Sequence, residues 1–450
     1  MGWIFTGLAF FFTYFMAKRS VVSGLVSVFA VGYVFGITRA NFPEMGTFFT
    51  FDAAVVAFYV VHHKLISSSF HSQDGQRLRH WVMALMLWPF ILFFIPLQDP
   101  LIQAVGLRGN IFLLPFVLIG AKLEDDEIYS LGLSLAMLNI FAFTIGATEY
   151  FTGIQHFYPQ NAVTDIIYRS NDVGINDAYR IPAIFANAHS YGGTMVLSLP
   201  LVVGAWIQRH KHVWHKNVLL VGMLAAILGV FMSAARSHFL ALSVLIMVFT
   251  LSASLRPAYR VGWLIILLVV GYMVAASPRL QRFTTLNDEE YVDARIRSSV
   301  NAGLFDALYQ YPFGNGLGGG GTSVPYFLAD KVERPFAMES ELGRMQLETG
   351  LIGVAGWIGF VVWVFMRPRV PRTDPWFVSL RMAFFVCAWF FVIGLIGIGL
   401  LTSIPSSAMM LMFLGWLGTR HTKAQPSLQF APANFAPPLH PVQSRGEVRG

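Results

Sequence analysis

The chain is short of cysteine and of charge. Cys387 is the one cysteine among 450 residues, so no intrachain disulfide can brace the fold. Charged residues make up 12% of the chain, whereas hydrophobic residues make up 55% and aromatic residues 15%. Soluble globular domains carry about twice that share of charge. The composition therefore excludes an ordinary soluble domain and predicts an all-α, polytopic membrane protein.

Apolar runs long enough, or nearly long enough, to cross a bilayer recur along most of the chain. We expect about twelve or thirteen transmembrane helices. The predicted spans are 3–17, 20–38, 47–63, 81–97, 107–123, 127–148, 186–207, 216–233, 238–255, 261–277, 346–366, 377–400 and 403–418. The short first run lacks the basic start and the cleavage site of a signal peptide, and the sequence leaves open whether it crosses the membrane.

Lysine and arginine in short loops predict the orientation of the bundle. If the helices alternate in direction, five basic stretches fall on one side, which the positive-inside rule makes the cytoplasm. These stretches are Lys18-Arg19, His62 to Arg79, Arg209 to Lys216, Arg256 to Arg260 and Arg367 to Arg372. The turn Ser233 to Ser237 then lies outside. The inside loops explain the net charge of +7, so we expect no nucleic-acid partner.

The pattern of apolar and polar stretches divides the chain into four regions. Residues 1–277 are predicted to form a transmembrane bundle with an outer loop at 149–185. Residues 278–345 form a large extracytoplasmic loop containing amphipathic helix, and residues 346–418 form the C-terminal transmembrane helices. Residues 419–450 are rich in Pro, Gln, Ala and Ser and are predicted to be a disordered cytoplasmic tail.

Arginines from three outer segments are the candidate anion-binding residues. Arg180 precedes a span, Arg236 lies in a very short outer turn, and Arg295 and Arg297 open the large loop. Guanidinium groups bind phosphate oxygens in pairs and stay charged at all working pH values, so a cluster of them suits a diphosphate. The alternative for each is an arginine that reaches from a helix end to the lipid headgroups. Arg236 fits that alternative least, because short outer turns disfavour positive charge.

Two more outer residues are candidates for acid–base chemistry. Glu341, Arg344 and Glu348 share one helix face, so we expect them to pair with one another. Glu339 lies before that ladder and remains available for another partner. His189 stands at the entrance to a span, where a lone histidine is more often a hydrogen-bonded structural residue.

The glycine-rich run after Tyr311 formally satisfies a dinucleotide-binding fingerprint through Gly314, Gly316 and Gly319. It follows an amphipathic helix rather than a strand and is expected outside, so we exclude a nucleotide site. We expect these glycines to permit a sharp reversal or a close approach of the backbone to a ligand. The acidic and histidine clusters elsewhere lack matching ligands, so no metal site is predicted.

Four segments, in this order, resemble the O-antigen ligase and O-antigen polymerase superfamily of bacterial membrane glycosyltransferases. They are Arg180 to Tyr191, Ser233 to Ser237, Arg297 through Tyr311 to Gly318, and Glu339 through Glu348-Thr349-Gly350 to Gly353. The resemblance implies an enzyme of the bacterial inner membrane with its active site on the extracytoplasmic face. It would transfer glycan from an undecaprenyl-pyrophosphate-linked donor to an acceptor hydroxyl, without a metal or other cofactor. It implies that Arg180, Arg236 and Arg297 hold the pyrophosphate, with Arg295 as a competing match for the last.

One departure from the family pattern bears on the choice between polymerase and ligase. Ligases of the family commonly carry His-Asn where this chain has Glu339-Ser340, which favours a polymerase of surface polysaccharide and leaves a ligase as the alternative. Glu339 is then the candidate base or orienting carboxylate for the acceptor hydroxyl, and His189 could replace the missing histidine. The expected partners are the lipid-linked donor, an acceptor glycan, membrane lipids and polysaccharide assembly proteins.

A transporter of a lipid-linked or amphiphilic anion is the alternative from another functional class. Transport predicts ionisable residues near the middle of several spans. Here the predicted spans are nearly free of them, and Asp52 is the main exception. A non-catalytic scaffold is a third alternative, but it would not require four ordered outer segments.

Overall fold

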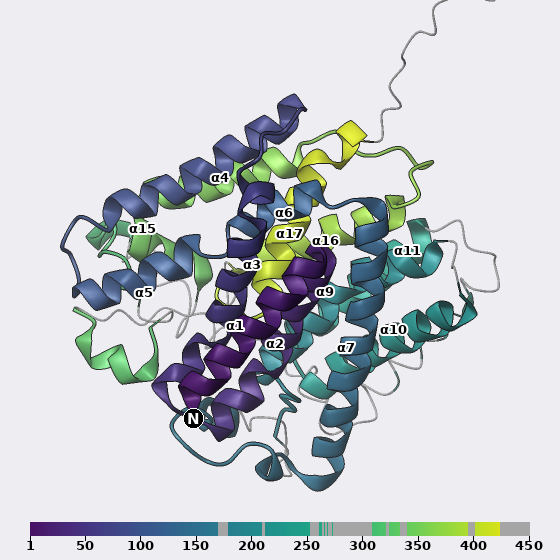
Figure 1. Cartoon of the computed structure of the whole chain (residues 1–450), viewed down its shortest axis with the longest axis horizontal. Coiled ribbons are helices and arrows are strands. Elements are labelled where there is room, and N and C mark those ends of the chain that lie inside the picture. The colour runs from purple at the N-terminus through teal and green to yellow at the C-terminus, as the bar shows by residue number, and fades with distance from the viewer. Residues whose placement is uncertain are drawn as a thin grey trace, which may run out of the picture.

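The computed structural model describes residues 1–169, 179–208, 212–252, 308–320, 324–333, 340–394 and 401–423, with isolated positions between 261 and 272. Across these residues the regular structure is entirely helical (Figure 1). Eight helical segments are long and apolar enough to cross a membrane. The chain is therefore an all-α, multi-pass membrane protein.

The described helices follow one another with short connections for most of the chain (Figure 1). In chain order they are α1 (Gly2–Arg19), α2 (Val21–Asn41), η1 (Met45–Phe49), α3 (Thr50–Ser67), α4 (Gln73–Leu92), α5 (Pro100–Ile111), α6 (Pro115–Lys122), α7 (Asp125–Thr152), η2 (Ile154–His156), α8 (Asp165–Arg169), α9 (Ala188–Ile207), α10 (Val213–Ser233), α11 (Arg236–Ser252), η4 (Tyr326–Lys331), α15 (Glu341–Phe365), α16 (Phe377–Gly394) and α17 (Ser406–Lys423). α5 and α6 together make one apolar segment of 23 residues, Pro100–Lys122.

Each predicted span that falls within the described residues overlaps a helix, but several boundaries differ. α4 begins eight residues before the predicted 81–97 and ends five residues before its end, and α17 continues to Lys423 instead of ending at 418. The predicted span at 261–277 lies outside the described residues except for isolated positions. α1, α4 and α17 are not among the eight segments, and α11 is an apolar helix of only 17 residues. The predicted total of about twelve or thirteen spans therefore stays a prediction.

Ion pairs between helix ends define one face of the bundle, here called the basic face. Asp74 at the start of α4 pairs with Arg367 just after α15. Arg420 near the end of α17 pairs with Asp125 at the start of α7 and with Asp374 ahead of α16. The basic face is at the top of Figure 1, and the N-terminus is at the opposite face, at the bottom. Three of the predicted cytoplasmic stretches reach this face, because Asp74 and Arg367 pair there and His215 contacts Tyr129, four residues after Asp125.

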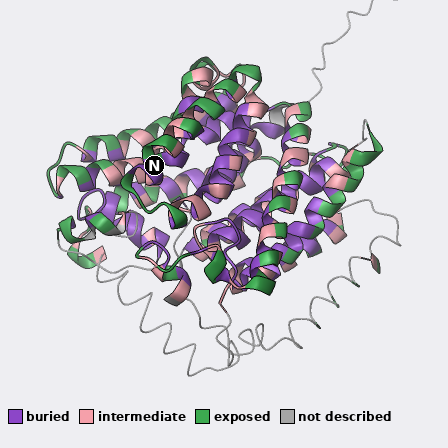
Figure 2. Cartoon of the chain, turned by 60° about the horizontal axis from the view of Figure 1, so that its bottom comes forward, coloured by how far each residue is buried: buried purple, intermediate pink, exposed green. Residues whose placement is uncertain are grey.

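α9 forms the centre of the bundle. In an apolar stretch of 18 residues within α9, 89% of the residues are buried. The helix contacts α7, α10, α11, α16 and α17. A chain of buried hydrogen bonds joins it to its neighbours: the Tyr33 hydroxyl donates to Asn139 Oδ1 at 2.8 Å, and Asn139 Nδ2 donates to Ser198 Oγ at 2.8 Å. Figure 2 shows buried residues on the inner sides of the helices and exposed ones around the outside. Many of these exposed residues are large and apolar, as expected for a surface in contact with lipid.

The glycine-rich run lies against α5 and α15 and makes a break in α15. Leu347 O accepts from Asn315 N at 2.5 Å, and Leu351 N donates to Pro312 O at 3.0 Å, so the bond expected between Leu351 and Leu347 within the helix is replaced by two bonds to the run. Gly350 adopts φ 66° and ψ −175° at this break. The run thus makes a close backbone approach to the protein's own helix, and the expected approach to a ligand stays a prediction.

Gly350→Ala is expected to destabilise the protein by about 1–3 kcal/mol, because this backbone conformation is nearly restricted to glycine. A Cβ at this position would also lie 2.6 Å from the carbonyl carbon of Phe313. Gly356→Ala in the same helix is the matched control, since its Cβ would make only an ordinary 3.6 Å contact with Leu85. Thermal unfolding in detergent measures both, and equal midpoints for the two variants would contradict this account.

Candidate functional site

Residues 179–187 form a segment that we call the strap, and it fixes the position of Arg180. Ala183 N donates to Glu149 Oε2 of α7 at 2.9 Å, and Ile181 N donates to Met232 O of α10 at 3.4 Å. The carbonyl of Ile184 accepts from Ile37 N of α2 at 3.1 Å. Three helices from distant parts of the sequence thus hold the backbone of the strap.

Tyr158 also holds the middle of the strap. Burial raises the pKa of Tyr158 well above its ordinary value, so the hydroxyl keeps its proton. It donates to the carbonyls of Ala183 at 2.8 Å and Phe185 at 2.7 Å. The strap also presses on α2 at Gly36, where a Cβ would lie 1.9 Å from the carbonyl carbon of Phe185. Only glycine permits this approach, and Arg180 therefore starts from a rigid segment.

Arg236 begins α11 directly after the end of α10. Ala234 caps α10 in the left-handed conformation, and its N–H donates to Phe231 O at 3.0 Å. This turn lies at the same end of the bundle as the strap, because the strap bonds to Met232 just before it. Arg180 and Arg236 are both half-buried. The structure therefore brings these two predicted arginines to one region of the opposite face.

Two histidines accompany these arginines, one on α9 just after the strap and one on α11. The rings of His189 on α9 and His238 on α11 are 4.2 Å apart, and Arg180 is close enough to His189 for their charges to interact. His189 is half-buried, and His238 is 2% exposed. Gly192 and Gly193 leave room for the His238 ring, since a Cβ at either would lie 3.1–3.2 Å from one of its nitrogens.

Strained backbone marks both arginine segments. Ala183 has φ 51° and Ala234 has φ 49°, and these are the two non-glycine residues with positive φ among those described. Such conformations cost about 1–3 kcal/mol each and often occur at functional sites. One lies three residues after Arg180 and the other two residues before Arg236, so the strain coincides with the residues predicted to bind the anion.

The C-terminal end of α16 contacts both the start of α11 and the start of α15. Trp389 Nε1 donates to Ser237 O at 3.0 Å, and the Phe390 ring lies 5.7 Å from that of His238. Ser340 Oγ, which also caps α15 through Gly343 N at 3.1 Å, lies 3.3 Å from Gly394 O. Phe390 and Gly394 are one turn apart on α16, so α15 begins at the same end of α16 as the histidine pair.

Three predicted site residues, Arg295, Arg297 and Glu339, lie outside the described residues. Ser340, directly after Glu339, is described at the position given above. The expected ladder is confirmed: Arg344 lies 2.6 Å from Glu341 and 2.5 Å from Glu348. The amphipathic helix expected in the large loop is also outside, apart from its last residues.

His238 and Glu149 were missed by the sequence analysis. His238 is a titratable side chain two residues after Arg236 in an otherwise apolar helix. That position alone would have marked it as a candidate site residue. Glu149 is 1% exposed, and its contact with the strap joins residues 34 positions apart, which no local pattern indicates. Both residues lie within the group of segments that hold Arg180 and Arg236.

This arrangement suits the binding of an anion near the membrane boundary. Two half-buried guanidinium groups on rigid supports can hold phosphate oxygens in a partly dehydrated environment, where their effect on negative charge is larger than in water. His189 can donate a hydrogen bond or accept a proton beside them. Among the described residues, no group of three or more His, Cys, Asp or Glu side chains is placed to hold a metal ion.

No protein-family model matches this chain, and no curated protein shows significant similarity to it.

Proposed function

We propose that this protein is a bacterial polysaccharide polymerase of the inner membrane. It transfers glycan from an undecaprenyl-pyrophosphate-linked donor to the hydroxyl of an acceptor glycan on the extracytoplasmic side. The observation that carries the proposal is the convergence of Arg180, Arg236 and the His189–His238 pair at one end of the bundle, away from the basic face. The four segments that resemble the O-antigen polymerase and ligase superfamily support the same reaction class.

The reaction exchanges a glycosyl–pyrophosphate bond for a glycosidic bond. The bond between the anomeric carbon of the donor sugar and the pyrophosphate oxygen breaks, and the acceptor oxygen bonds to that carbon. Undecaprenyl pyrophosphate leaves with the bonding electron pair, while the acceptor proton passes to a base. Arg180 and Arg236 stabilise the leaving pyrophosphate, and Arg297 completes the clamp. Glu339 is the proposed base, next to the described Ser340, and His189 is the second candidate.

The orientation in this proposal follows from the distribution of charge. The basic face holds Lys18-Arg19, Lys122 and Arg367 to Arg372, and short loops rich in lysine and arginine are retained in the cytoplasm. The strap and the turn at Arg236 are at the other end of the same helices. A lipid-linked donor flipped to the outer leaflet would place its pyrophosphate at that depth.

A transporter is less well supported than an enzyme. Asp52 was the main ionisable exception in the predicted spans, and it accepts two hydrogen bonds from Arg108, at 2.6 Å from Nε and 2.5 Å from Nη2. The pair satisfies its own charges within the described bundle. The pairing with Arg108 therefore explains Asp52, the residue that most favoured a transporter, as a structural residue.

Deleting the encoding gene and analysing lipid-linked glycan tests the proposal. A polymerase predicts loss of long surface polymer and accumulation of single repeat units on the lipid carrier. Accumulation of finished but unattached chains would indicate the ligase instead. Repeat units confined to the cytoplasmic leaflet would indicate a transporter, and unchanged surface glycan and carrier would contradict all three functions.

A further inference from the structure

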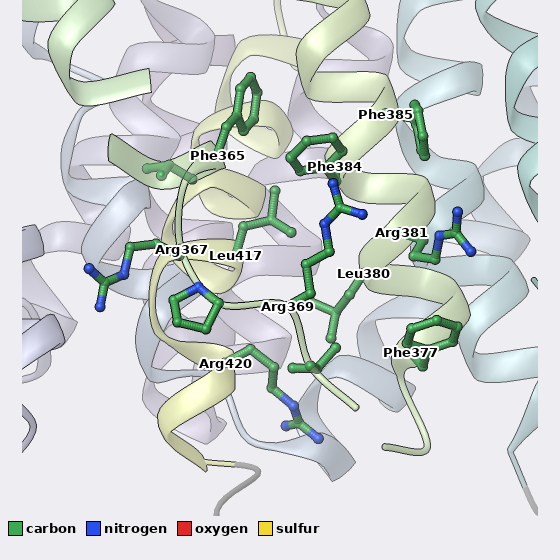
Figure 3. Close-up of a pocket in the computed structure, with 13 residues that line it drawn as sticks. Phe365, Arg367, Arg369, Phe377, Leu380, Arg381, Phe384, Phe385, Leu417 and Arg420 are labelled. Atoms are coloured by element: carbon green, nitrogen blue, oxygen red, sulfur yellow. The ribbon is translucent and has the colours of Figure 1, made fainter. Parts of the chain in front are cut away.

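A groove opens on the basic face, far from the proposed catalytic region. It lies where the end of α15, the loop that follows it, α16 and α17 meet (Figure 3). Its apolar wall is formed by Phe365, Phe377, Phe384 and Phe385 together with neighbouring aliphatic residues. Four arginines also line it: Arg367, Arg369, Arg381 and Arg420. Aromatic wall and positive charge thus occur in one concave site.

Two of the four arginines are neutralised within the protein. Arg367 pairs with Asp74, and Arg420 pairs with both Asp125 and Asp374. In Figure 3 these two side chains point away from the middle of the groove. Their charges are therefore compensated by the bundle and give no reason to expect a ligand.

The other two arginines have no carboxylate partner among the described residues. Arg369 contacts the Phe384 ring at 5.7 Å, and Arg381 contacts the Phe377 ring at 5.7 Å. Figure 3 shows Arg369 extending from the loop toward Phe384. Phe384 is seven residues beyond Phe377 on α16, which is about 10 Å deeper in the bundle from the basic face. Arg369 is exposed, but its guanidinium lies along the apolar wall beside Phe384.

An uncompensated guanidinium at this depth is stabilised best by an anion that arrives with its own apolar chain. We propose that the groove binds one anionic phospholipid of the leaflet at the basic face. Arg369 and Arg381 take the phosphate oxygens of the headgroup, and an acyl chain lies along Phe365, Phe384 and Phe385. This site is separate from the proposed transferase region, so its test does not depend on that activity.

Native mass spectrometry of the full-length protein with phosphatidylglycerol tests this site. The double variant Arg369→Ala/Arg381→Ala is expected to bind this lipid roughly thirtyfold more weakly, because two headgroup contacts are lost. Arg372→Ala is the matched control: it is an exposed arginine in the same loop that does not line the groove, and it should bind as the unaltered protein does. Equal binding by the double variant and the control would overturn the proposal.

Two further ligands distinguish an anionic lipid headgroup from a free phosphate ion and from a lipid without net charge. Phosphatidylcholine, which has no net charge, and inorganic phosphate, which has no acyl chain, are both expected to raise the thermal unfolding midpoint less than phosphatidylglycerol does. Phe384→Leu should weaken phosphatidylglycerol binding without changing the response to inorganic phosphate. Equal stabilisation by inorganic phosphate, or by phosphatidylcholine, would contradict a site for an anionic lipid.

Discussion

Replacing Arg180 or Arg236 by alanine is expected to abolish polymer formation while the amount of protein in the membrane stays unchanged. Loss of one fixed donor to a developing negative charge in a dehydrated site typically costs on the order of 10²–10³ in rate. Both side chains are half-buried, and hydrogen bonds hold the strap that carries Arg180 in place. Complementation of the deletion strain, read out by surface-glycan gels and immunoblotting, measures both quantities.

Lysine substitutions at the same two positions, and an alanine substitution of a distant arginine, test whether the loss of activity is specific to the two guanidinium groups. Arg180→Lys and Arg236→Lys keep the charge but lose the planar pair of donors, so we expect partial activity and shorter polymer. Arg77→Ala is the control, because Arg77 is exposed on the basic face. Polymer of normal length in both alanine variants would eliminate the proposed pyrophosphate clamp.

Arg344→Ala is expected to cause the largest loss of stability, about 3–5 kcal/mol, because it would leave two buried carboxylates without their shared cation. Glu341, Arg344 and Glu348 have side chains that are 0% exposed. Asn110 Nδ2 donates to Glu348 Oε2 at 2.6 Å, but an amide cannot neutralise the charge. Thermal unfolding in detergent is the measurement.

Two comparison variants separate charge from packing in this buried triad. Arg77→Ala removes a solvent-exposed arginine 4.0 Å from Asp74 and should cost less than about 1 kcal/mol. The triple variant Glu341→Gln/Arg344→Met/Glu348→Gln removes all three charges and should recover most of the loss. If Arg344→Ala unfolds at the same temperature as Arg77→Ala, burial of the charges is not what makes the triad important.

The sequence was sufficient to predict the class of fold because composition and apolar runs report directly on the surrounding lipid. Helix ends were less predictable, because hydropathy marks the apolar middle of a helix and not its caps. Ser72 accepts from Gly75 N at 3.1 Å and starts α4 ahead of its apolar part, and Asp99 accepts from Leu101 N at 2.8 Å and starts α5 in the same way. Both caps are residues that commonly begin helices, so attention to them would have corrected the starts of both helices.

The candidate site was predictable only where one residue carried an anomaly of its own. Arg236 was unusual for a short outer turn, and its region does lie beside the strap. The contact between His189 and His238 depends on how α9 and α11 pack, which a single sequence does not reveal. The pairing of Glu341, Arg344 and Glu348 was predictable, because helical spacing places them on one face. Their complete burial beneath the glycine-rich run was not predictable from that spacing.

The way the strap is held also sets an order of events during biosynthesis. Its anchors in α2 and α7 are made before it, but Met232, which accepts from Ile181, is made about fifty residues after it. While the ribosome is still producing α10, the strap therefore lacks one of its supports. A chain stalled before that point would keep the bonds of the strap to α2 and α7 but would lack its bond to α10.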